Sequence, residues 1–210
     1  WQRLGSPTGM DLYNWGLSNN PDTTITDLGE VLNRAMIHNR APVIPAGTWL
    51  MSSIANIPSH TILSGMGIGN TVVLREGSPN SMFMNKSDGT IGGYGATTNI
   101  TIQDFTIDAR MDDYPAPCTP IGTGHASNVR IYRMEINNVP GRWHAIELNA
   151  TYDGLIEDCR FNRGGLDLYD GECIQLDAAI DGGPFPWFGP YDLTVCGKIV
   201  INRCTFSDWS

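Results

Sequence analysis

The chain has 210 residues, of which 17% are charged, 24 are Gly and 13 are Pro, and its formal net charge is −9. This length allows one domain with a sizeable core, and turn residues mixed with apolar segments favour a turn-rich β protein over a disordered chain. The negative charge argues against nucleic acid as a partner, because phosphates require a basic surface. No apolar run is long enough to span a membrane. The five cysteines lack C-x-x-C spacing, so buried thiols are the simplest interpretation.

The first 40 residues predict a strap followed by a capping helix. Residues 1–24 are polar and rich in Asn, Pro and Gly. Asp27 followed by Glu30 resembles a capping box, and the helix should end near Asn39. Its apolar residues form one stripe at helical spacing: Leu28, Val31, Leu32, Ala35 and Met36. Such a helix would cover the first strand layer of a solenoid.

Short strands separated by Gly and Pro turns are predicted within residues 41–51, 54–58 and 61–74. A pattern of alternating apolar and polar residues then occurs four times. Alternation with period two predicts a strand with one buried face, and two polar residues inside each copy predict a bend. The inward positions recur at spacings of 29, 25 and 45 residues and are Phe105, Met134, Cys159 and Cys204.

A repeat near 25 residues that buries its apolar face against its neighbours is typical of a solenoid. Because each repeat consists of strands, we predict an all-β fold, a right-handed parallel β-helix with an N-terminal capping helix. Residues 1–210 should form one domain, with the strap and capping helix in 1–40 and the coils in 41–210. The last repeat leaves an open end, so we expect more chain to follow in the full protein. An acid should destabilise strongly at the inward Met134 and change stability little at the outward Arg130.

The segment Pro45-Ala-Gly-Thr48, followed by Gly65-Met-Gly67, resembles the N-terminal region of the pectate-lyase-like superfamily of right-handed parallel β-helices. The resemblance runs from about Leu12 to the last residue. Its members include phage tailspikes and tail-associated glycan depolymerases, and the fold carries hydrolases, lyases and adhesins. The resemblance implies a polysaccharide partner, an extracellular or virion-tail location and, for a tailspike-like protein, a homotrimer. The Gly-His-Gly segment of the polygalacturonases is absent from this sequence, so pectin is not indicated as the substrate.

Two strand-like segments, residues 143–149 and 171–177, carry the polar side chains of the predicted catalytic site. We align Ile146 with Ile174, because equivalent residues of stacked coils lie about 4.8 Å apart. This alignment brings three further pairs together: His144 over Glu172, Glu147 over Gln175 and Asn149 over Asp177.

Glu147 and Asp177 are the predicted acid and base of a glycoside hydrolase, with Glu172 and His144 orienting them. Their Cβ atoms should lie roughly 8 Å apart, and carboxyl groups about 6.5–9.5 Å apart suit an inverting mechanism. Like charge and partial burial should push their pKa values apart, so that one carboxyl stays protonated. The alternative interpretation is that each is an ordinary polar residue on a solvated face.

An aromatic insertion at residues 181–192 should bind the sugar. Trp187 and Tyr191 would stack on apolar sugar faces, whereas Phe185 and Phe188 more simply fasten the loop to the solenoid wall. The alternative is that the whole loop only packs on that wall. The predicted substrate-binding residues are Trp187, Tyr191, Gln175, Asn149, Trp143 and Asp181.

A second insertion, residues 108–124, would form the opposite wall of a groove. Asp112 and Asp113 leave Ca²⁺ open as a cofactor, although two adjacent acids alone indicate a metal poorly. No other metal or cofactor is indicated.

The function predicted from these features is depolymerisation of an extended cell-surface or capsular polysaccharide by carboxylate acid/base hydrolysis. Three alternatives stay open: a polysaccharide-binding adhesin without activity, a polysaccharide lyase that uses an arginine, and a structural spacer.

Overall fold

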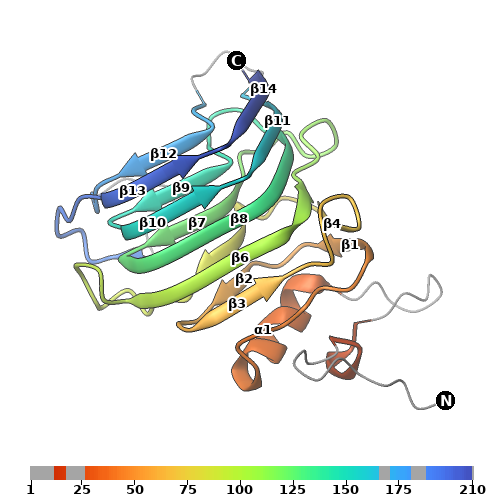
Figure 1. Cartoon of the computed structure of the whole chain (residues 1–210), viewed down its shortest axis with the longest axis horizontal. Helices are drawn as coiled ribbons and strands as arrows, with labels where there is room; N and C mark the ends of the chain where they lie inside the picture. Colours follow the sequence, from red (N-terminus) through yellow and green to blue (C-terminus); the bar gives the residue numbers. More distant parts are fainter. Residues whose placement is uncertain (1–11, 18–26, 166–170, 181–187, 210) are drawn as a thin grey trace.

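The computed structural model describes residues 12–17, 27–165, 171–180 and 188–209. Parallel strands form two sheets, and the chain coils from one sheet to the other around a shared core (Figure 1). Sheet A contains β1 (Gly47–Met51), β3 (Thr61–Ser64), β4 (Thr71–Arg75), β6 (Thr97–Asp108), β8 (Ala126–Val139), β10 (Tyr152–Glu157), β11 (Arg160–Gly164), β13 (Gly197–Asn202) and β14 (Thr205–Trp209). Sheet B has the order β12 (Ile174–Asp177), β9 (Ile146–Asn149), β7 (Thr119–Gly124), β5 (Ser81–Asn85) and β2 (Ala55–Ile57). This is a parallel β-helix, as the repeats predicted.

The N-terminal end of the solenoid is covered by α1 (Leu28–His38), beside the short 3₁₀ turn η1 (Leu12–Trp15) (Figure 1). Asp27 caps α1 by accepting a hydrogen bond of 2.9 Å from the backbone N–H of Gly29. The same carboxylate accepts bonds from the backbone and hydroxyl of Ser52, which fixes the helix to the end of β1. The predicted apolar stripe is buried, so the predicted capping helix is confirmed.

The predicted inward ladder is also confirmed. Phe105 pairs with Met134, and Phe161 pairs with both Ile136 and Phe206. The rings of Phe161 and Phe206 stack with centroids 5.1 Å apart. The five cysteines are free thiols, and burial raises the pKa of Cys159 to about 12. Layers of apolar side chains therefore repeat along the axis of the solenoid.

The bend predicted inside each repeat is made by residues with positive φ. Asp104, Arg133, Asp158 and Arg203 hold equivalent positions and have φ between 45° and 64°. Their side chains alternate in charge along the axis, and the Arg133–Asp104 and Arg203–Asp158 pairs are each 2.6 Å long. Alternating ion pairs thus offset part of the strain of left-handed bends at residues other than glycine.

The second predicted insertion needs a correction, because its last six residues form a strand of sheet B. Thr119–Gly124 forms β7, which lies between β5 and β9. Pro120, Gly122 and Gly124 conceal its alternation in the sequence, because they give the segment the composition of a turn-rich loop. The rest of the insertion remains a connection between sheets A and B.

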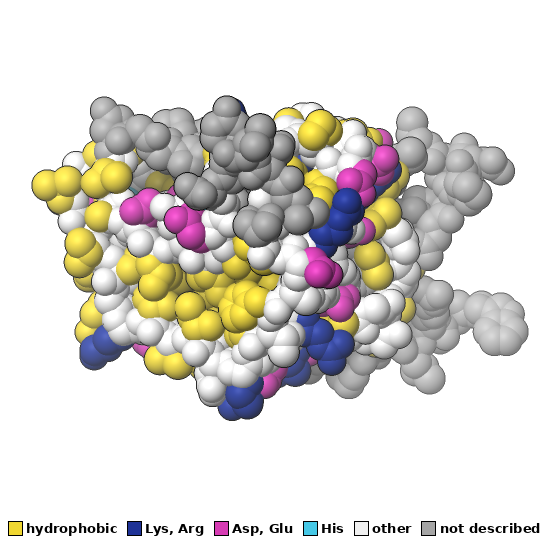
Figure 2. All heavy atoms as spheres, turned by 90° about the horizontal axis from the view of Figure 1, so that it is seen from above, with side chains coloured by type: hydrophobic (Ala, Val, Ile, Leu, Met, Phe, Trp, Pro, Cys, Tyr) yellow, Lys and Arg dark blue, Asp and Glu magenta, His cyan; other side chains and the backbone are white. Residues whose placement is uncertain are grey.

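The end of the solenoid at β13 and β14 presents apolar side chains. Figure 2 shows hydrophobic side chains gathered in the middle of this face. Ile201 and Phe206 occupy inward positions of the last layer, yet they are 45% and 52% exposed. No described strand covers this layer. Among the described residues, no helix has the length and apolarity needed to cross a membrane.

Candidate functional site

The predicted alignment of the two site strands is confirmed by the pairing of β9 and β12. Ile146 pairs with Ile174, Glu147 with Gln175, and Asn149 with Asp177. On the other side of β9, Glu147 pairs with Gly122 of β7, which in turn pairs with Met84 of β5. Glu147 therefore belongs to an outward row that runs from β5 to β12.

Glu147 is nevertheless buried, with 2% of its surface exposed. Burial raises the pKa of its carboxyl group to about 7, with a smaller contribution from the nearby charge of Asp177. Asn149 donates a hydrogen bond of 2.7 Å to Oε1, whereas Oε2 has no hydrogen-bond partner among the described residues. A carboxyl group in this setting is protonated at mildly acidic pH, as a general acid must be.

Amide side chains support both carboxylates of the predicted pair. Gln175 donates a hydrogen bond of 2.9 Å from Nε2 to Oδ2 of Asp177, just as Asn149 donates to Glu147 one layer below. Asp177 is half-buried and ends β12. The structure thus places Glu147, Asn149, Gln175 and Asp177 together on two neighbouring strands.

The predicted contact between His144 and Glu172 is present, but it lies at the other end of these strands from Asp177. Nδ1 of His144 is 3.0 Å from the backbone oxygen of Glu172 and 3.3 Å from its Oε2. His144 is 7% exposed, and the neighbouring Trp143 is half-buried. The pair can fasten the starts of β9 and β12, which fits the interpretation of His144 as a hydrogen-bonded histidine at a turn.

The segment after β12 packs on the outer face of sheet B. Phe188 is buried against Met84 and meets the backbone of Gly124, where a Cβ atom would lie 2.3 Å from the Phe188 ring. This packing agrees with the interpretation of Phe188 as a staple. Trp187 and Asp181, two predicted substrate-binding residues, lie outside the described residues.

Tyr191 follows this staple and is 40% exposed. It lines a small cleft with Asn149 and Phe188, and with His125 after β7. The volume of the cleft is about 20 Å³, roughly enough for one water molecule. In this conformation the cleft does not admit a sugar ring.

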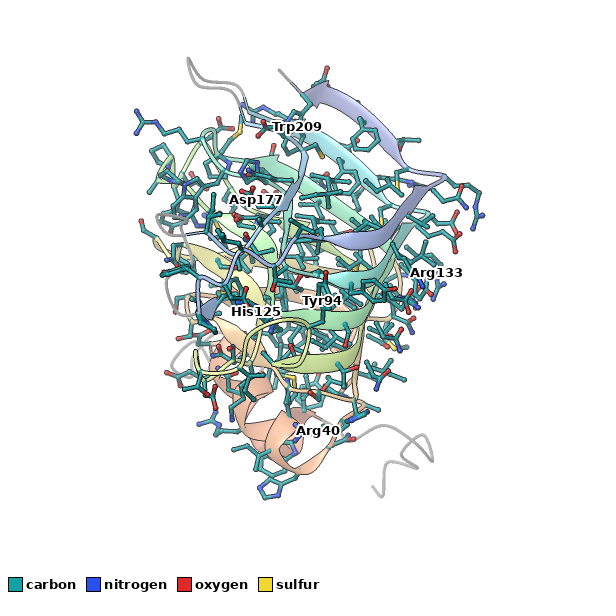
Figure 3. All side chains as sticks on the ribbon, turned by 90° about the vertical axis from the view of Figure 1, so that its left-hand side faces the viewer. Arg40, Tyr94, His125, Arg133, Asp177 and Trp209 are labelled. Carbon is teal, nitrogen blue, oxygen red and sulfur yellow. The ribbon has the colours of Figure 1, made fainter. Side chains whose placement is uncertain are left out.

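His125 lies in this region, although the strand pattern assigns it no role. It is 2% exposed, and its ring nitrogens each lie 2.8 Å from a backbone oxygen, Nδ1 from Gly93 and Nε2 from Pro190. The N–H of Gly93 also donates to Asp192, and this bond helps to hold the pKa of Asp192 at about 2. Figure 3 shows His125 beside Tyr94, whose hydroxyl donates to the backbone oxygen of Val195. These contacts join two loops that are a hundred residues apart in sequence, which a single sequence does not reveal.

The acidic pair considered for Ca²⁺ is held in ion pairs. Asp112 lies 2.6 Å from Arg163, and Asp113 lies 2.8 Å from Arg110. Among the described residues, no three His, Cys, Asp or Glu side chains are grouped as a metal would require. These carboxylates therefore stabilise the connection between the sheets in this structure.

No family model matches the chain. The chain is 29% identical over 197 residues to a pre-neck appendage protein of Bacillus phage B103, a match that covers 87% of this chain and 21% of the phage protein. Its fold is similar to that of PfbA, a surface adhesin of Streptococcus pneumoniae, with a TM-score of 0.75, 20% identity and coverage of 94% of this chain and 48% of PfbA.

The A-module of the mannuronan C-5 epimerase AlgE4 from Azotobacter vinelandii is also similar, with a TM-score of 0.57, 15% identity and coverage of 80% of this chain and 49% of that structure. The chain thus spans about a fifth of the phage protein and about half of each solved structure. These likenesses show the fold, which an adhesin and an epimerase share.

Proposed function

We propose that this chain is a right-handed β-helix of the pectate-lyase-like type that binds and cleaves an extended cell-surface polysaccharide. Glu147 acts as the general acid and Asp177 as the general base of glycoside hydrolysis. The observation that carries the proposal is the buried Glu147, whose pKa is raised to about 7, one layer and two residues from Asp177. The similar phage appendage and surface adhesin support a virion-tail or extracellular location.

The chemistry follows from the different surroundings of the two carboxyl groups. The protonated Glu147 can give its proton to the leaving glycosidic oxygen, and the half-buried Asp177 can take a proton from the attacking water. Tyr191 offers an aromatic face for a sugar, and Gln175 and Asn149 hold the carboxylates in place. Trp143 stays a predicted sugar-binding residue, as do Trp187 and Asp181, which lie outside the described residues. A homotrimer stays part of the proposal as the family resemblance implies it, and Ca²⁺ at Asp112 and Asp113 stays open.

Release of reducing ends from a panel of bacterial polysaccharides tests this proposal. Glu147→Gln and Asp177→Asn should each lower turnover by at least about a hundredfold, while binding changes little. Glu135→Gln, a carboxylate of sheet A outside the site, is the matched control and should keep full turnover. Equal turnover in all four proteins would refute the assigned pair. A product with ultraviolet absorbance from a new double bond would indicate a lyase instead.

A polysaccharide-binding adhesin is the second candidate, and a specific observation favours it. Glu147 is 2% exposed and the cleft at the neighbouring Asn149 has a volume of about 20 Å³, so a glycosidic oxygen reaches the carboxyl group only if the residues that cover it move. An adhesin would bind the polysaccharide and release no oligosaccharide under any condition. Binding without release, unchanged in Glu147→Gln, would select this candidate.

A further inference from the structure

A groove with both polar and apolar lining residues runs beside the capping helix, where the chain leaves sheet B. It consists of two adjoining hollows of about 420 and 600 Å³, both lined by Arg40, Pro58, Lys86 and Ser87. Each volume lies within the range of about 300–1,000 Å³ that is usual for ligand sites. The groove is therefore far larger than the cleft at Tyr191.

The groove holds two cations, Arg40 and Lys86, against one carboxylate, although the chain as a whole carries −9. Arg40, Lys86 and His60 line it and are exposed. Neither Arg40 nor Lys86 takes part in an ion pair with the described residues. Arg40 instead donates to the backbone oxygen of Met36, which fixes its guanidinium at the end of α1.

One carboxylate, that of Asp88, stands among the described residues that line the groove. Its Oδ1 already accepts bonds of 2.9 and 2.7 Å from the backbone and hydroxyl of Thr90. These bonds lower the pKa of Asp88 and keep it ionised. Asp88 forms no ion pair with Arg40 or Lys86, so both cations remain unpaired among the described residues.

The neutral groups of the groove also present donors. Ser59 and Ser87 accept backbone N–H bonds from Thr98 and Gly89, each 3.1 Å long, so their own hydroxyl protons are available to a ligand. A groove that offers ammonium, guanidinium and hydroxyl donors suits a ligand rich in acceptor oxygens.

The tautomer of His60 is fixed by a short chain of side-chain amides. Asn128 donates to Oδ1 of Asn99, so the other end of the Asn99 amide donates to Nδ1 of His60 at 3.1 Å. Nδ1 is therefore an acceptor, and the proton of the neutral ring must be on Nε2. His60 adds one more N–H donor to the groove.

We propose that this groove binds the acidic units of a saccharide, with the sugar carboxylate held between Arg40 and Lys86. The neighbouring serines and His60 then donate to sugar oxygens. The proposal concerns binding at the cap and stands whether or not Glu147 is catalytic. Nothing in the outward row at Glu147 supplies a comparable positive charge for a sugar carboxylate.

The groove and the candidate site lie along the same side of the solenoid. Figure 3 shows Arg40 beside the helix, His125 near the middle and Asp177 toward the other end. Lys86 follows β5 and Asn149 ends β9, and these strands are separated only by β7. Two layers correspond to about 10 Å, so one extended chain bound in the groove would reach the candidate site once the cleft at Tyr191 has opened.

Binding of trigalacturonate, measured by calorimetry and by NMR shift mapping, tests the proposal, with maltotriose as the neutral sugar and inorganic phosphate as the simple anion. Trigalacturonate should bind with shifts at Arg40, His60 and Lys86, and maltotriose should bind much more weakly. Lys86→Gln should weaken binding by roughly tenfold, since one charged hydrogen bond is lost, and Lys86→Glu should weaken it further. Lys198→Gln, a lysine over the ring of Tyr152, is the matched control and should change affinity less than twofold.

Equal binding of maltotriose, or trigalacturonate affinity unchanged in Lys86→Glu, would overturn the proposal. The proposal would also be overturned if inorganic phosphate bound at Lys86 and trigalacturonate did not. A glycan-release assay that shows no role for Glu147 would leave these binding results intact, so the two proposals fail separately.

Discussion

At the scale of single residues, Glu147 shows how burial changes the chemistry of an outward position. The strand pattern predicts a polar side chain on the outer face of sheet B, and Glu147 has that position. The segment around Phe188 packs over the same face, and burial raises the pKa of Glu147 to about 7. A raised carboxyl pKa means that the folded state binds its proton more tightly than the unfolded state does.

This linkage predicts how stability depends on pH. Glu147 contributes its full stabilisation below its ordinary pKa of 4.5, and that contribution is lost as the pH rises through about 7. The free energy of unfolding should fall by on the order of 3 kcal/mol over this interval from this group alone. Urea unfolding at several pH values should show a smaller decrease for Glu147→Gln, with a gain in stability at pH 8. Glu135→Gln keeps Glu147, so its free energy of unfolding should fall with pH as steeply as that of the parent protein. An equally steep fall in Glu147→Gln would contradict the prediction.

For Arg130 the structure changes the expected effect of a substitution. The pattern places it on the outer face, which is correct, and suggests that an acid there would change stability little. Its guanidinium makes two bonds of 3.0 and 3.1 Å to the carboxylate of Asp153 and a third to the Asp153 backbone oxygen. An acid at position 130 would lose these bonds and face Asp153 with like charge, so it should destabilise.

At the scale of elements, the segment 188–195 is held on sheet B by contacts from both sides. Phe188 packs on Gly124, and the backbone of Pro190 lies against His125. The N–H of Leu193 donates a bond of 3.0 Å to the backbone oxygen of Ala179. The described part of this segment is thus held by one aromatic residue and a few hydrogen bonds.

Gly124→Ala should release this segment. The backbone of Gly124 is not left-handed, so alanine is allowed there, but its Cβ would lie 2.3 Å from the ring of Phe188. Amide hydrogen exchange at Leu193 and Gly93 should become at least about tenfold faster. In a Phe188→Ala background the same substitution should have little further effect, because the steric conflict has been removed. Unchanged exchange at both amides would show that the segment is held without Phe188.

At the scale of the whole molecule, the apolar face at β13 and β14 should govern how the 210-residue chain behaves in solution. Exposed edge strands and apolar patches associate with one another, and Ile201 and Phe206 are exposed in this layer. Sedimentation equilibrium should show self-association, and Ile201→Lys should weaken it by about tenfold or more. Ile62→Lys, an exposed residue on the outer face of β3, is the control and should leave association unchanged. A chain that is monomeric at the highest concentration measured would contradict this prediction.

The local pattern of the sequence determined the coils, the capping helix and the register of β9 on β12. These features depend on apolar periodicity and helix capping, which act within a few residues, and on repeats that must stack in order. The same periodicity is enough to place Glu147, Gln175 and Asp177 on neighbouring strands. Their roles in catalysis and sugar binding stay predictions.

Tertiary structure alone decided what surrounds these residues. Glu147 is buried although its strand position faces outward. The contacts of His125 join loops that are distant in sequence, and the groove at Lys86 is also lined by distant segments. The spacing of these segments follows no period. The strand β7 cannot be read from the local pattern, because its glycine and proline residues resemble a loop until β5 and β9 pair with it on both sides. Periodicity therefore sets which face of a coil a residue occupies, whereas burial and charge depend on which loops fold over that face.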